Sequence, residues 1–157
     1  MKPGTLLGMA LLTVGLAALT ASTSAQGGSD DPKHGHGHVC DDSMLKGTYG
    51  TQVVGERPAG EGKREQFVAL ALGTFDGQGM FTQVDNSHGF SGTGVDRPGS
   101  GTYTVNPDCT GTLTLWTEGL PFPIETRFVV FDKGTETRGL VMAPAVIVGT
   151  ITSRRLF

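Results

Sequence analysis

Glu125 and Arg127 are the pair of side chains whose types and spacing best suit chemistry in this sequence. Residues two apart share one face of a β-strand, so this pair could orient a polar ligand or act as an acid and base. Such pairs also occur on faces that meet only solvent. Apolar residues lie on both faces of the surrounding segment 123–131, so the sequence leaves both interpretations open.

The other candidates are single residues. Tyr49 and Tyr103 could turn a hydroxyl group into an interior, although Tyr103 is equally explained as a core residue. Arg138 could add a cation, and His88 is a lone histidine in an expected loop, where such residues are usually solvated. The candidate ligand-binding residues are Arg127, Glu125, Arg138, Tyr49 and His88. The candidate catalytic residues are Glu125, Tyr103 and Arg138.

Three histidines at alternate positions are the chemical feature of the segment from 26 to 43. The imidazoles of His34, His36 and His38 could converge on copper, nickel or zinc. Glycine spacers give no preorganisation, so ordering the segment would cost much of the binding energy. The segment is almost free of apolar residues, and we expect a disordered tail that serves either as a metal ligand or as a soluble spacer with incidental metal affinity.

Motifs of several enzyme classes are absent from the sequence. It contains no serine nucleophile elbow, glycine-rich phosphate loop, HExxH zinc motif or paired CxxC motifs. We therefore expect no cofactor. The formal net charge is −3 and the basic residues are scattered, so no basic stripe is present to follow a nucleic-acid backbone. We therefore do not expect nucleic acid as a partner.

The first 25 residues have the pattern of a secretory signal peptide. Lys2 precedes an apolar run over 5–20, and small residues precede an expected cleavage site after Ala25. The run is shorter than a membrane-spanning helix needs and lacks a basic stop-transfer flank. We expect a secreted or periplasmic protein with no membrane span in the mature chain.

Cys40 and Cys109 are the two cysteines of the chain. Export to an oxidising compartment favours a disulfide between them, with Cys109 fastened in a turn and Cys40 just before the first strand. A reactive thiol is the alternative, but Asp108 beside Cys109 would raise the pKa of that thiol rather than lower it.

Beyond Cys40 the sequence changes to short alternating runs separated by glycine, proline and aspartate turns, which predicts an all-β domain over 44–157. The expected strands are 46–54, 66–75, 80–85, 100–106, 110–117, 123–131, 136–142 and 145–154. Short turns at 76–79, 107–108 and 132–135 favour hairpins. Eight strands in an up-and-down order favour a small closed or nearly closed antiparallel barrel over a sandwich. The longer segments 55–65 and 86–99 are expected as rim loops, where ligand entrances tend to lie.

Two segments are apolar on both faces, namely 67–72 and 145–148. One face of each strand would point outwards and need cover, either from a terminal segment or from another subunit. A homo-oligomer and coverage by the chain's own tail therefore remain equal alternatives.

Three motifs carry a resemblance to known sequences: LKGTYG at 45–50, GTFDGQGMFT at 73–82 and SGTYTVNPDCTGTLTL at 100–115. They resemble a group of uncharacterised secreted bacterial proteins with a Y-x-V-x-x-D-C-x-G turn. The resemblance implies a barrel similar to that of allene oxide cyclase and, more loosely, to lipocalins. No catalytic residue of the cyclases transfers to a position here, and the lipocalin G-x-W signature is absent near the first strand.

Three functional hypotheses follow. The first is a secreted barrel that binds a small apolar or amphipathic molecule in its interior, or a protein on its surface. The second is a cofactor-free isomerase or cyclase that confines its substrate there. The third is a purely structural envelope protein. The direction of Glu125, Arg127 and Arg138 distinguishes them, because the enzyme hypothesis needs these side chains inside the barrel.

Overall fold

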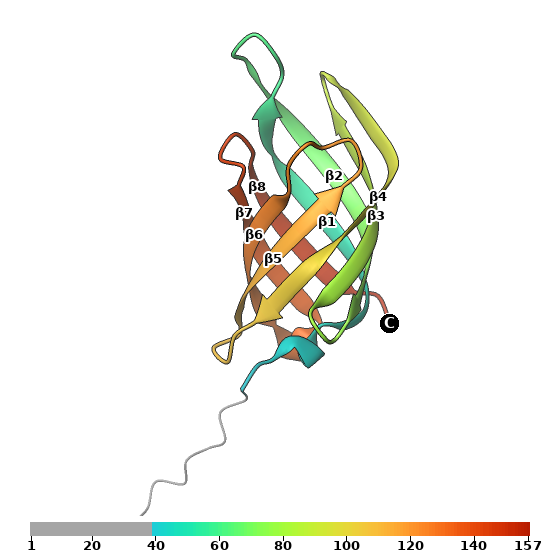
Figure 1. Cartoon of the computed structure of the whole chain (residues 1–157), viewed down its shortest axis with the longest axis vertical. Helices are drawn as coiled ribbons and strands as arrows, with labels where there is room; N and C mark the ends of the chain where they lie inside the picture. Colours follow the sequence, from blue (N-terminus) through green and yellow to red (C-terminus); the bar gives the residue numbers. More distant parts are fainter. Residues whose placement is uncertain (1–38) are drawn as a thin grey trace, which may run out of the picture. The chain divides into compact units, whose positions relative to one another are not determined.

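The structure is a computed structural model, and it describes residues 39–157 (Figure 1). Eight strands and two short 3-10 helices make up this part of the chain. In order they are η1 (Asp42–Met44), β1 (Lys46–Pro58), β2 (Arg64–Asp76), β3 (Met80–Gly89), β4 (Gly92–Val105), β5 (Thr110–Thr117), β6 (Ile124–Phe131), η2 (Asp132–Gly134), β7 (Glu136–Ala143) and β8 (Val148–Arg155).

The strands form a closed antiparallel barrel in sequence order. Each strand pairs with the next, and β1 pairs with β8 over Tyr49↔Arg155 to Glu56↔Val148, which closes the sheet. Closure gives each strand a partner on both sides in the body of the barrel, whereas residues 92–98 of β4 pair with β3 alone. The expected all-β, eight-stranded barrel is confirmed, as is the single disulfide between Cys40 and Cys109.

Alternation along each strand separates the interior from the exterior. In β2, Phe67, Ala69 and Ala71 face inwards, while Val68 and Leu70 between them are exposed on the outside. This period of two is the property of extended chains on which the fold prediction depended.

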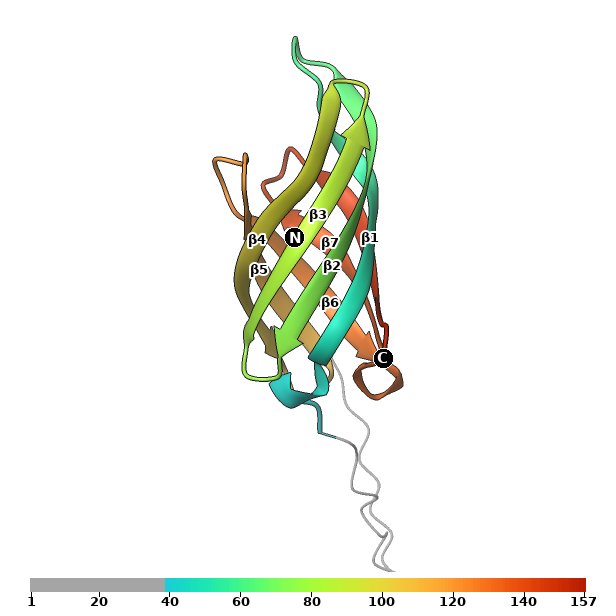
Figure 2. The ribbon, with the colours of Figure 1, turned by 90° about the vertical axis from the view of Figure 1, so that its right-hand side faces the viewer.

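The prediction of two long rim loops was wrong. Residues 55–65 belong mostly to β1 and β2, whose ladder continues to the pair Pro58↔Arg64. Residues 86–89 lie in β3 and residues 92–99 in β4, and the two strands remain paired to Gly89↔Gly92, with only residues 90–91 left as the turn. Cross-strand hydrogen bonding outweighs the low strand propensity of these glycine-rich segments. The two hairpins therefore extend beyond the neighbouring turns at one end of the barrel (Figure 2).

Two further boundaries differ from those expected. Residues 145–147 form a turn, and β8 begins only at Val148. Residues 40–43, assigned to the tail from the sequence, belong to the fold: Cys40 is 3% exposed, and the carboxylate of Asp42 accepts a hydrogen bond from Val105 N at 2.6 Å. In the described part of the chain, no helix is long and apolar enough to cross a membrane.

An aromatic core fills the end of the barrel beside η1, which we call the closed end. The ring of Phe75 lies 5.1 Å from each of the rings of Tyr49, Phe81 and Tyr103. Leu45, directly after η1, is 2% exposed and belongs to the same cluster. Leu45, Phe75 and Phe81 of this core also border the space inside the barrel.

Candidate functional site

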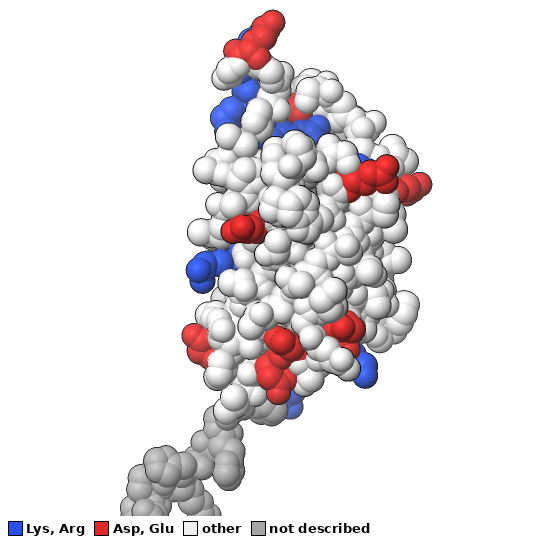
Figure 3. Space-filling model, in the orientation of Figure 1, with Lys and Arg blue, Asp and Glu red and all other residues white. Residues whose placement is uncertain are grey.

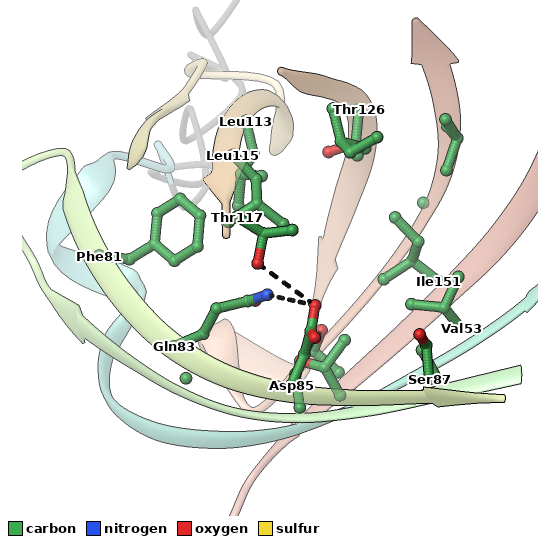
Figure 4. Close-up of a pocket in the computed structure, with 18 of the residues that line it drawn as sticks. Val53, Phe81, Gln83, Asp85, Ser87, Leu113, Leu115, Thr117, Thr126 and Ile151 are labelled. Carbon is green, nitrogen blue, oxygen red and sulfur yellow. Dashed lines mark hydrogen bonds between the residues drawn. The ribbon is translucent and has the colours of Figure 1, made fainter. Parts of the chain in front are cut away.

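A cavity of about 170 Å³ lies inside the barrel beyond this aromatic core. All eight strands contribute to its walls, because the inward residues of each strand face a common space. Phe75 and Phe81 form its floor. The apolar part of the wall includes Ala69 and Ala71. It also includes Val53, Leu113, Leu115 and Ile151, which Figure 4 shows around the cavity.

Strand β3 places three polar side chains in this cavity. Phe81 faces inwards at the floor, and alternation then turns Gln83, Asp85 and Ser87 to the same side. In Figure 4 the side chains of Gln83 and Thr117 are directed at the carboxylate of Asp85. The distances are 3.4 Å from Gln83 Nε2 and 3.5 Å from Thr117 Oγ1 to Asp85 Oδ2.

Arg97 of β4 neutralises the charge of Asp85. Its Nε donates to Asp85 Oδ1 at 2.8 Å, and both side chains are largely buried. Asp85 and Arg97 are also directly opposed in the β3–β4 ladder. An ion pair with this burial costs less than a lone carboxylate in an apolar interior.

A β-bulge next to this pair shapes the site. Between the pairs Asp85↔Arg97 and Ser87↔Gly94, one residue of β3, Asn86, opposes two residues of β4. The bulge gives Gly94 the interior position beside Ser87. A Cβ atom at Gly94 would lie 2.4 Å from Arg97 Nε, so only glycine leaves room for the guanidinium there.

Ser87 is the one described residue whose buried side-chain oxygen has no hydrogen-bond partner among the described residues. The residue is 6% exposed and lines the cavity. Buried hydroxyl groups are nearly always hydrogen-bonded, so the Ser87 hydroxyl is an exception among the polar groups of this cavity.

Arg57 and Glu65 form a second ion pair at the far end of the interior. Arg57 Nε donates to Glu65 Oε1 at 2.6 Å, and the amide of Ser91 donates to Glu65 Oε2 at 2.6 Å. Hydrogen bonds from the Ser91 hydroxyl and from Arg57 lower the pKa of Glu65 from 4.5 to about 2. The network joins the β1–β2 hairpin to the β3–β4 turn and leaves no charge unpaired.

Four of the sequence-predicted site residues face outwards, which corrects the prediction that they form the site. Glu125, Arg127, Arg138 and His88 are all exposed on the outer face of their strands. The interior face of β6 is instead set by Thr126 and its alternate neighbours, so Glu125 and Arg127 meet solvent. Arg138 donates to the carboxylate of Glu136 at 2.6 Å on the outside of the barrel.

The two tyrosines face inwards but lie in the closed end, below the cavity. The Tyr49 hydroxyl donates to Gly134 O and accepts from Arg155 Nε at 3.1 Å. The Tyr103 hydroxyl lies 3.1 Å from the carbonyl oxygens of both Asp42 and Leu45, and burial raises its pKa. Neither tyrosine lines the cavity, and the hydroxyl groups of both are bonded to other parts of the protein.

The candidate metal ligands His34, His36 and His38 lie outside the described residues, as does the expected signal peptide. Within residues 39–157, no group of three or more His, Cys, Asp or Glu side chains is arranged to hold a metal ion. The metal hypothesis therefore stays a prediction about the segment that precedes the barrel.

The outer face of the barrel carries apolar side chains, as the sequence predicted for 67–72. Leu70 is 64% exposed, and Leu72 and Trp116 are each 55% exposed. The face drawn in Figure 3 is mostly uncharged, with Lys, Arg, Asp and Glu scattered over it. The homo-oligomer remains a prediction.

Sequence reasoning missed the residues that do line the polar part of the interior. They include Arg57, Asp85, Ser87 and Arg97, and Arg57 is paired with Glu65. The sequence contained a signal for three of them, because alternate residues of a strand share a face. If Phe81 faces the interior, Asp85 and Ser87 face it too, and if Tyr103 faces the interior, so does Arg97. No protein-family model, curated protein or solved structure matches the chain. The resemblance to secreted bacterial barrel proteins thus stays a prediction.

Proposed function

We propose that this protein is an exported barrel that binds one small, largely apolar or amphipathic molecule in its interior. The observation that carries the proposal is the cavity of about 170 Å³ between the aromatic floor and the ion pair of Asp85 and Arg97. A purely structural barrel has no need of such a space, since filling it would add stability.

The size of the cavity limits the ligand. An engineered apolar cavity of about 150 Å³ stays dry and binds benzene, so the cavity here suits a single ring or a short branched chain. Its walls are mainly apolar, and the polar groups around Asp85 come from β3, β4 and β5. Further polar side chains in the wall come from other strands: Thr51, Arg57, Thr126, Thr137 and Ser153. Walls of this kind with a few converging polar groups are typical of small-molecule sites.

Small inward residues create the space. Ala69, Ala71 and Gly73 follow one another on the inner face of β2, where larger residues would fill the barrel. The cavity therefore results directly from the small residues in the sequence of this strand.

The cyclase or isomerase alternative has less support. It relied on Glu125, Tyr103 and Arg138, and none of these lines the cavity. Among the residues that line it, the carboxylate of Asp85 is already paired with Arg97, and no histidine is present to act as a base at neutral pH. We therefore propose binding without a chemical step.

Toluene, titrated into the full chain and followed by amide NMR shifts, tests the proposal. We expect saturable shifts at residues of β2, β3 and β5 that line the cavity. The variant Ala71→Leu should weaken toluene binding at least tenfold, because the added carbons occupy the cavity.

Thr74→Ala is the matched control, since Thr74 lies on the same strand but is exposed on the outside. It should leave toluene binding unchanged. Absence of saturable binding of both toluene and phenol to the wild-type protein, or equal toluene binding by Ala71→Leu, would overturn the proposal.

A further inference from the structure

The hydroxyl group of Ser87 is the starting point for the chemical class of the ligand. It is buried in the cavity wall and has no hydrogen-bond partner among the described residues. A hydroxyl group can donate one hydrogen bond and accept others. A ligand with a polar atom at this level would satisfy it, whereas a purely apolar ligand would leave it unpaired.

Asp85 has spare accepting capacity next to Ser87. Its Oδ1 accepts from Arg97 at 2.8 Å, but its Oδ2 has contacts only at 3.4 Å and 3.5 Å. These two distances lie beyond the usual range for strong hydrogen bonds. Asp85 and Ser87 are alternate residues of β3, and in Figure 4 both oxygen-bearing groups point into the same space.

The charges around the cavity balance one another. Asp85 pairs with Arg97, and Arg57 pairs with Glu65. An ionised ligand would lose its hydration without gaining an unpaired counter-charge, which disfavours both carboxylates and amines. A neutral polar group meets no such penalty.

We infer that the natural ligand is a small neutral molecule with a hydroxyl group on an apolar ring or short chain, that is, a phenol or an alcohol. Its hydroxyl oxygen accepts a hydrogen bond from Ser87 Oγ and its hydroxyl proton is donated to Asp85 Oδ2. The apolar body lies between Ala71, Leu113 and the aromatic floor. This inference rests on the proposed function, since it assumes that the cavity is the binding site.

Phenol and toluene are the probes that test the inference, because they have nearly the same shape and differ in one hydroxyl group. Titrations into the full chain give both dissociation constants by amide NMR shifts. Phenol is the more strongly hydrated of the two, so an apolar cavity without polar partners would prefer toluene. We expect phenol to bind at least as tightly as toluene, and benzoate and benzylammonium to bind at least tenfold more weakly than phenol.

The variant Ser87→Ala assigns the preference to one hydroxyl group. We expect it to weaken phenol binding about fivefold, the effect of losing one hydrogen bond, and to leave toluene binding unchanged or tighter. Ser100→Ala is the matched control, since Ser100 is exposed on the outer face of β4. It should change neither constant.

The outcomes separate the two proposals. Saturable toluene binding with weaker phenol binding, or equal phenol binding by Ser87→Ala and wild type, would overturn the assignment of a hydroxyl ligand and leave the cavity as an apolar site. Tight binding of benzoate or benzylammonium would overturn the charge argument. Absence of binding by every probe would overturn the proposed function and the inference with it.

Discussion

The two ends of the barrel use the same strand alternation for opposite purposes. At the closed end the inward residues are large rings, and Tyr49 is 1% exposed within an aromatic cluster. In the other half the inward positions of β2 carry Ala69, Ala71 and Gly73, and a cavity remains. One barrel thus has a packed half that supplies stability and a hollow half that we propose as the ligand site.

The buried hydroxyl groups of the two halves differ in whether the protein supplies their hydrogen-bond partners. Both tyrosine hydroxyls of the closed end have protein partners, including the carbonyl oxygens of Gly134 and Leu45. Ser87 in the hollow half has none among the described residues. Satisfied buried hydroxyls fix a structure, whereas an unsatisfied one at a cavity wall indicates a place for a ligand.

The largest loss of stability is expected from a substitution in the packed half. Tyr49→Ala removes a fully buried ring together with its contacts to Phe75 and Arg155, and we expect it to lower the free energy of unfolding by about 4 kcal/mol. Urea denaturation measures the loss. Leu72→Ala is the control, since Leu72 is 55% exposed on the outer face, and it should cost less than about 1 kcal/mol. Similar costs for both variants would contradict the division into two halves.

Removal of the disulfide should have the next largest effect. Cys40 and Cys109 are separated by 69 residues in sequence, and their bond restricts the unfolded chain while holding residues 40–45 against the closed end. We expect the double variant Cys40→Ser, Cys109→Ser to lose about 3 kcal/mol in the same assay. The folded variant should still bind toluene as the wild type does. A loss of binding in the folded state would show that the two halves are coupled.

Glu65, in the hollow half, should make the stability of the protein depend on pH. Its pKa is lowered from 4.5 to about 2, so its ionised form contributes stability that is complete above pH 4.5 and disappears as the pH falls towards 2. Glu65→Gln should be less stable than wild type at neutral pH, and the difference should vanish near pH 2. The other carboxylates with lowered pKa remain in both proteins: Asp76, Asp108 and Glu136.

Urea denaturation of both proteins from pH 2 to pH 7 measures this difference. A difference independent of pH would show that Glu65 acts by packing and not by its charge. Arg64→Gln is a control at an exposed ion pair of the same hairpin, where a small change is expected.

The smallest loss of stability is expected from a substitution at the β-bulge between β3 and β4. The side chain of Asn86 accepts from the amide of Asp96 at 3.0 Å and donates to its carboxylate at 3.2 Å, both on the exposed face. Asn86→Ala should cost about 0.5–1 kcal/mol of stability. Its effect on phenol binding should exceed that on toluene binding, because the bulge positions Gly94 and Arg97. An equal effect on both ligands would contradict this positioning role.

The sequence by itself determined the architecture. Alternating short runs with glycine, proline and aspartate turns predicted eight antiparallel strands, and strand 110–117 has the predicted bounds. The disulfide was also predictable, because the expected export and a pair of cysteines favour it. These features depend on local pattern and composition, which a single sequence contains.

Only the tertiary structure decided which face of each strand is inside. Glu125 and Arg127 share a face with Val129, so the pattern of that strand alone was ambiguous, and closure of the barrel turned this face outwards. The partnership of Asp85 and Arg97 likewise depends on the β3–β4 register and on a bulge. A shift of one residue exchanges the two faces of a strand, and the register is set by pairing with neighbours rather than by the strand itself. The site was therefore fixed by contacts between strands, while the fold was visible in each strand separately.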